Sequence, residues 1–158
     1  MVEKGLSGLS RCFRGAVSAF GKEGKLLFVG SPFTCLPFAE FLSYGIRDLQ
    51  LMCYFMPGTD ITNIIRLIPR KGFGFQLAMQ VQEEKNGFDV IVLLGGLAMP
   101  KSQVSPKVLK EQLLKVSNLD FAMALFFQGI MRMPEWLEEF KFKYVVDADI
   151  SRVVLEEW

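Results

Sequence analysis

The chain of 158 residues contains no histidine. Histidine is the commonest general base near neutral pH and a frequent ligand of zinc. Its absence excludes a Ser-His-Asp triad, a Cys-His dyad and a histidine-based metal site within this chain, and a second copy of the same chain cannot supply the missing residue. Any chemistry must therefore depend on other groups.

The chain also lacks an excess of charge of either sign. It has 18 basic and 17 acidic residues, a formal net charge of +1, and no stripe of basic residues stands out. Because affinity for nucleic acid depends on cations aligned with the phosphate backbone, we expect no nucleic-acid partner.

Cysteine is scarce, and no apolar run is long enough for a membrane helix. The three cysteines form no closely spaced pair, which is typical of free thiols in a reducing compartment. The nearly uncharged run over 26–46 is broken by glycine and proline, whereas a membrane helix needs about 20 apolar residues. The N-terminus lacks the apolar core of a signal peptide. We therefore expect a cytoplasmic protein without a membrane segment.

Apolar residues make up 51% of the chain, including 15 phenylalanines and 8 methionines. A chain of this size fits one domain over 1–158 with a large core. The abundance of Phe and Met also favours a buried face between two copies, so we expect a homodimer.

Strand-like and helix-like segments alternate along the chain. The predicted helices cover 5–20 (within an N-terminal segment 1–22), 31–45, 75–85, 105–118 and 133–141. The predicted strands cover 25–30, 49–56, 63–68, 88–94, 121–127 and 143–150. Residues 61–69 also fit a helix, and 150–158 fit an edge strand or a tail. The alternation predicts an α/β fold, a Rossmann-like three-layer sandwich with a mostly parallel sheet.

Three predicted strands end in similar loops, in which glycine comes first and proline follows near a helix start. These exits carry Gly30, the pair Gly95 and Gly96, and Gly129. In a parallel sheet they lie at one edge, where open α/β sheets bind ligands. Glycine lets backbone approach a ligand, and helix N-termini attract anions. The loops thus predict a site for a small anionic ligand, a nucleotide or phosphorylated metabolite, although glycine and proline here are also ordinary element boundaries.

The predicted ligand-binding residues come from these loops. They are Gly30, Ser31, Thr34, Gly95, Gly96, Lys101, Gly129 and Arg132. The hydroxyls of Ser31 and Thr34 equally suit helix capping, and Lys101 and Arg132 are the nearest basic side chains in sequence. No loop matches a nucleotide-binding motif, so backbone N–H groups would do most of the binding, and the cofactor is unknown. The segment "GFGFQ" (72–76) is a candidate flap.

The candidate catalytic residues are Cys35, Asp147 and Asp149. Cys35 lies near a predicted helix start, which lowers a thiol pKa, but a small buried apolar residue is the alternative. Asp147 and Asp149 would face the same side of a strand end. They could hold Mg²⁺, act as an acid/base pair, remain solvated or cap the next turn, and we assign no metal site.

The segments "LLFVGSPFTCLPFAE", "GFGFQL" and "VLLGGLAMPK" resemble a family of archaeal proteins of unknown function, found mainly in methanogens. The resemblance spans roughly 5–150. It implies a cytoplasmic Rossmann-like α/β domain and draws attention to the loops at 30–35, 72–77 and 95–101, but it implies no activity.

Three hypotheses about function follow from these observations. The first is a small-ligand-binding domain. The second is an enzyme acting on a phosphorylated or acyl substrate through Cys35 or the pair Asp147 and Asp149. The third is a homodimeric interaction module that needs no small ligand.

Overall fold

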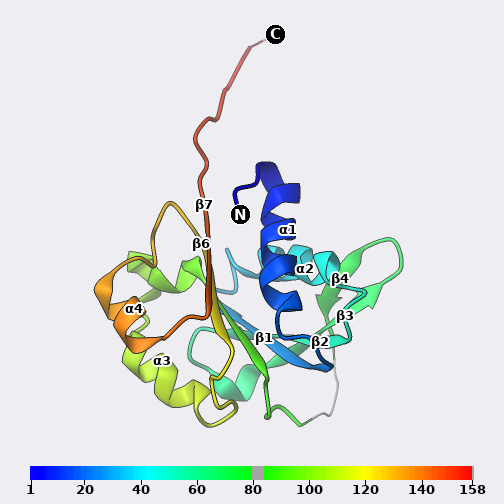
Figure 1. Cartoon of the computed structure of the whole chain (residues 1–158), viewed down its shortest axis with the longest axis vertical. Coiled ribbons are helices and arrows are strands. Elements are labelled where there is room, and N and C mark those ends of the chain that lie inside the picture. Colours follow the sequence, from blue (N-terminus) through cyan, green and yellow to red (C-terminus); the bar gives the residue numbers. More distant parts are fainter. Residues whose placement is uncertain (80–83, 158) are drawn as a thin grey trace.

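The protein is described by a computed structural model that covers residues 1–79 and 84–157. In this part of the chain, seven strands form one sheet in the order β4-β3-β2-β1-β5-β6-β7 (Figure 1). The strands are β1 (Gly24–Gly30), β2 (Leu51–Pro57), β3 (Ile65–Arg70), β4 (Gly74–Leu77), β5 (Val90–Leu94), β6 (Ala122–Phe127) and β7 (Tyr144–Ala148). Strand β3 pairs antiparallel with both β2 and β4, with which it forms a hairpin at one edge of the sheet. The neighbouring strands in the order β2-β1-β5-β6-β7 pair in parallel. The predicted α/β sandwich with a mostly parallel sheet is confirmed.

Helices cover both faces of the sheet, as Figure 1 shows. One face carries α1 (Gly5–Ser18) and α2 (Leu36–Gly45), and the other carries α3 (Pro106–Leu113) and α4 (Pro134–Glu139). Short 3₁₀ turns cover Ile61–Asn63, Gly95–Ala98 and Pro100–Ser102. Successive side chains of a strand point to opposite faces. Accordingly, Leu26 and Phe28 belong to the core under α1 and α2, whereas Leu27 and Val29 belong to the core under α3 and α4.

Most predicted elements are present, with shifted ends. The helix predicted over 31–45 begins only at Leu36, so Pro37, and not Pro32, lies in its first turn. The ambiguous segment 61–69 divides into a 3₁₀ turn and β3. Residues 150–157 form no strand and leave the body as a tail (Figure 1). None of the helices in the described residues is long and apolar enough to cross a membrane.

The helix predicted over 75–85 is wrong in its described part. Residues Gly74–Leu77 form β4, in which Leu77 pairs with Leu67 and Gln76 with Ile68. The backbone hydrogen bonds of the hairpin outweigh the helix propensity that the local pattern indicated, because such propensities are weak compared with tertiary pairing. Residues 80–83 of this prediction lie outside the described residues.

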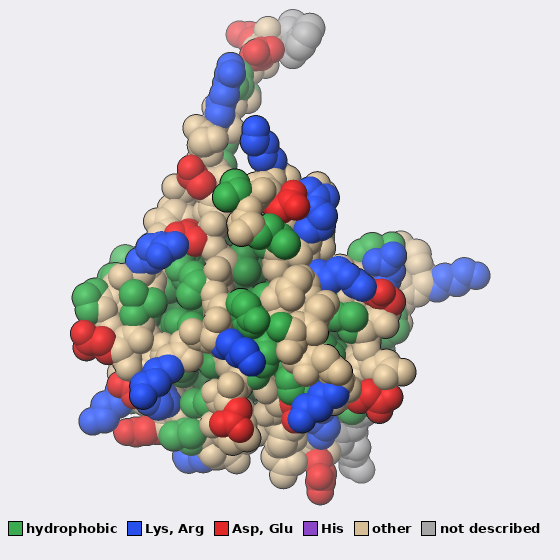
Figure 2. Space-filling view, in the orientation of Figure 1, with side chains coloured by type: hydrophobic (Ala, Val, Ile, Leu, Met, Phe, Trp, Pro, Cys, Tyr) green, Lys and Arg blue, Asp and Glu red, His purple; other side chains and the backbone are tan. Residues whose placement is uncertain are grey.

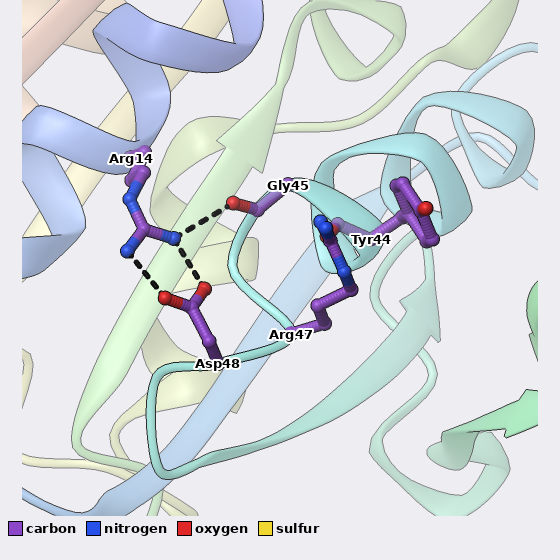
Figure 3. Close-up of polar contacts among 5 residues, drawn as sticks. All are labelled: Arg14, Tyr44, Gly45, Arg47 and Asp48. Carbon is purple, nitrogen blue, oxygen red and sulfur yellow. Dashed lines mark hydrogen bonds and ion pairs between the residues drawn. The ribbon is translucent and has the colours of Figure 1, made fainter.

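An ion pair joins α1 to the end of α2 (Figure 3). The Arg14 guanidinium donates to both oxygens of Asp48, at 2.5 and 2.7 Å, and to the carbonyl oxygen of Gly45 at 3.0 Å. The cation thus also meets the negative end of the α2 dipole. The hydrogen bonds from Arg14 lower the pKa of Asp48 from 3.8 to about 2.

We expect the stability contributed by Asp48 to depend on pH. A carboxylate with a lowered pKa in the folded state stabilises the fold above its unfolded pKa, and this contribution disappears as the pH falls from about 4 towards 2. Urea unfolding of the wild type and of Asp48→Asn should therefore differ at neutral pH and converge in acid. Glu156→Gln, in the tail, is the matched control, and a difference that persists at the lowest pH would contradict the assignment.

Candidate functional site

A pocket of about 310 Å³ lies at the carboxyl edge of the sheet, where the strand order reverses. The chain passes from β1 to β2 on one side, and β5 lies on the other side of β1. The loop after β1 leads to α2 on one face of the sheet, and the loop after β5 leads to α3 on the other face. Open α/β sheets bind ligands at such a position. The pocket is lined by Thr34, Cys35, Phe38, Leu94, Gly95, Gly96, Met99, Leu125, Phe127, Gln128 and Ile130.

The floor of the pocket depends on the packing of Cys35 against two glycines. Cys35 is the N-cap residue of α2 and is 4% exposed. A Cβ atom added to Gly30 would overlap the Cβ of Cys35, and one added to Gly96 would overlap its Sγ. These glycines are therefore required for the close approach of the α2 start to the ends of β1 and β5, and not for a positive φ.

The walls of the pocket are mainly apolar. The rings of Phe38 and Phe127 lie 5.0 Å apart, centroid to centroid, and Leu94 and Leu125 come from the central strands. The side chains that bring polar or sulfur atoms to the lining are Thr34, Cys35, Met99 and Gln128, and the Thr34 Oγ1 atom lies 3.7 Å from the Cys35 Sγ atom. This environment favours an apolar guest.

The structure brings together the predicted residues of the first two loops. Thr34, Gly95 and Gly96 line the pocket. Gly30 lies against Cys35, and Ser31 lies beside Gly96, since its Cβ is 3.3 Å from the place that a Cβ of Gly96 would take. Lys101 is exposed and does not line the pocket. Whether these residues bind a ligand stays a prediction.

In the third loop, the groups predicted to bind an anion instead bind a carboxylate of the protein itself. The Gly129 N–H donates to Asp147 Oδ1 at 3.0 Å, and Arg132 Nε donates to Asp147 Oδ2 at 2.6 Å. Asp147 is contributed by β7. The other members of the loop, Gln128 and Ile130, line the pocket instead.

Backbone N–H groups at the rim of the pocket likewise donate hydrogen bonds to other groups of the chain. The Cys35 N–H donates to the Ser31 carbonyl oxygen at 2.9 Å, and the Met99 N–H donates to the Gly96 carbonyl oxygen at 3.3 Å. An anion at this rim would have to replace bonds that the loops already make.

The candidate catalytic residues lie in different environments. Cys35 lies in the pocket, whereas Asp147 is paired with Arg132 and Asp149 is exposed beyond the end of β7. Within the described residues, His, Cys, Asp and Glu side chains form no group of three that could hold a metal ion. Burial raises the pKa of the Cys53 thiol to about 11, which keeps this cysteine protonated at neutral pH.

Sequence reasoning missed the apolar lining of the pocket. Leu94, Leu125 and Phe127 belong to strands that are buried on both faces, and such strands read as continuous apolar runs. Nothing in these runs distinguishes a residue at a pocket from one in the core. Phe38, one turn into α2, had the same ambiguity.

Comparisons with known proteins give a consistent result. A family model described as "uncharacterized protein conserved in archaea (DUF2124)" matches residues 4–151. An uncharacterized protein of Methanocaldococcus jannaschii is 40% identical over 149 residues, which cover 94% of this chain and 88% of that protein. An uncharacterized protein of Methanothermobacter thermautotrophicus is 32% identical over 147 residues, which cover 90% of this chain and 88% of that protein. A crystal structure of a protein of unknown function from Methanothermobacter thermautotrophicus matches with a TM-score of 0.85 and 28% identity, covering 99% of this chain and 96% of the other.

We expect Gly30→Ala and Gly96→Ala to respond differently to the removal of the Cys35 thiol. Overpacking costs roughly 1–3 kcal/mol, and Gly30→Ala should lie at the upper end because Cys35 Cβ cannot rotate away. In a Cys35→Ala background, Gly96→Ala should recover more of its stability than Gly30→Ala, because the removed sulfur is the closest atom to the new methyl group at 96, whereas the Cβ of residue 35 still overlaps the one at 30. Urea unfolding of the four variants measures this, and equal recovery of both would contradict the packing described.

Proposed function

Since the chain belongs to the family of uncharacterized proteins conserved in archaea (DUF2124), we propose that it is a small-ligand-binding α/β domain whose ligand occupies the pocket at the carboxyl edge. The observation that carries this proposal is a cavity of about 310 Å³ at the place where the strand order reverses. Ligand sites of open α/β sheets occur at this position, and the volume lies within the range of small-molecule sites.

The ligand should place an apolar group in the pocket. Phe38, Leu125 and Phe127 are among the apolar residues that line it, and burial of apolar area contributes about 25 cal/mol per Å². A fully anionic molecule would lose hydration in this environment without enough donors to replace it.

An anionic group on the same ligand would remain at the mouth of the pocket. Thr34, which is exposed, supplies a hydroxyl there, and Lys101 follows the lining residue Met99 by two positions in sequence. The expected anionic ligand therefore becomes an amphipathic one, with its apolar part inside the pocket and its charge outside.

The test combines native mass spectrometry with thermal unfolding. Freshly purified protein should carry a small adduct, or should gain about 5–10 °C in Tm with a medium-chain fatty acid or an aromatic carboxylate at saturating concentration. The variant Thr34→Phe fills the mouth from an exposed position, so it should lose the adduct and the gain in Tm.

The control variant is Val108→Phe, which adds the same ring at an exposed position of α3 outside the pocket lining. It should bind as the wild type does. Equal stabilisation of Thr34→Phe and the wild type by every ligand that binds would show that the pocket is not the site.

A further inference from the structure

A second concave site lies between the end of α2 and the turn of the β3–β4 hairpin. It has a volume of about 610 Å³ and is lined by Tyr44, Arg47, Pro69, Arg70, Lys71, Gly72, Gly74 and Phe75. We call it the hairpin groove. Strand β3 runs antiparallel to β2, with Leu67 opposite Cys53 and Ile65 opposite Phe55, so its last residue, Arg70, lies towards the start of β2. The groove is therefore at the amino edge of the parallel strands, opposite the apolar pocket.

The groove concentrates positive charge. Arg47, Arg70 and Lys71 are exposed cations, and none of the described residues that line the groove is acidic. Figure 2 shows Lys and Arg side chains at the hairpin that projects on the right of the view. Asp48, the neighbour of Arg47 in sequence, is directed towards Arg14 and is bound by it through two hydrogen bonds (Figure 3).

Arg47 is held in a geometry that suits phosphate recognition. Its guanidinium lies over the ring of Tyr44, with 4.2 Å from its central carbon to the ring centroid, and its Nη1 donates to the Tyr44 carbonyl oxygen at 2.9 Å (Figure 3). A guanidinium stacked on a ring keeps its donors in the plane, where they match the oxygens of a phosphate. Because the side chain is already ordered, less conformational entropy is lost on binding.

The hairpin turn gives the groove an open backbone wall, and Phe75 of the same hairpin lines the groove. Gly72 and Gly74 have φ values of 83° and 75°, and the Phe73 N–H donates to the Arg70 carbonyl oxygen at 3.0 Å. A Cβ added to either glycine would meet nothing within 4 Å, so these glycines serve the backbone conformation and leave space above it. Phe73, at the tip of the hairpin, is 76% exposed and lies outside the groove lining.

We propose that the hairpin groove binds a nucleoside phosphate. The phosphates lie against Arg47, Arg70 and Lys71, and the base packs on the aromatic rings of the groove. Arginine and lysine donors recognise phosphate oxygens through charge-assisted hydrogen bonds, and a planar base stacks on an aromatic side chain without requiring a particular base sequence. This site is separate from the apolar pocket and does not depend on the function proposed for that pocket.

The test is isothermal titration calorimetry of the full chain at low salt. The probes are adenosine triphosphate, adenosine, inorganic tripolyphosphate and a short single-stranded oligonucleotide. The nucleotide should bind more tightly than either of its two parts. Arg47→Gln and Arg70→Gln should each weaken its binding about tenfold, as expected for loss of a charge-assisted contact. Arg47→Lys should also weaken it, because lysine keeps the charge but loses the planar donors.

The matched control is Lys107→Gln, an exposed cation at the start of α3, which should leave the affinity for nucleotide unchanged. Thr34→Phe should also leave it unchanged, so failure of the pocket proposal is separable from failure of this one. Absence of nucleotide binding, or binding that is lost in Thr34→Phe and retained in Arg47→Gln, would overturn the proposal. If tripolyphosphate bound as tightly as the nucleotide, the proposed role of the aromatic rings would be overturned. If the oligonucleotide bound markedly more tightly than the nucleotide, the ligand of the groove would be nucleic acid and the proposal would be overturned.

Discussion

The contact of Cys35 with Gly30 and Gly96 is the constraint on which the carboxyl edge depends. The N-cap residue of α2 packs between the ends of β1 and β5. No residue larger than glycine fits at positions 30 and 96, which it contacts. This packing fixes where α2 begins, and so fixes the position of Phe38 one turn later. The space left between Phe38, the end of β6 and the turn after β5 is the pocket. Its shape is thus a consequence of how a helix start is packed against two strand ends.

The same packing explains why this edge is apolar. Loops that fold tightly on themselves use their own carbonyls and carboxylates to satisfy their N–H groups, as Cys35, Met99 and Gly129 do. Open α/β sheets that bind phosphate leave such groups exposed. The cations of the groove lie instead at the opposite edge, where the β3–β4 hairpin and the end of α2 meet. Glycine therefore has two different uses in this chain, close packing at 30 and 96 and a left-handed turn at 72 and 74.

The sequence predicted the layers, the parallel central strands and the convergence of the loops after β1 and β5, because these follow from periodicity and from the boundaries of buried runs. It did not predict β4, since strand pairing with β3 is a tertiary effect. It placed positive charge at Arg132 without anticipating that Asp147 would neutralise it, because residues 15 positions apart meet only after β7 has joined the sheet. Arg47 and Lys71 were overlooked for the same reason, as their proximity arises only in three dimensions. Homodimerisation and the identity of any ligand stay predictions.

Helix α2 connects the two sites. Its N-cap, Cys35, forms part of the apolar pocket, and Tyr44 in its last turn forms part of the hairpin groove. A helix of ten residues is about 15 Å long, so the sites lie about that far apart along one rigid element. The start is held by the glycines that receive Cys35, and the end is held by Arg14 through Gly45 and Asp48. Because both ends are held, α2 cannot slide along its axis without breaking one of these contacts, and the geometry of each site is maintained by the same two attachments.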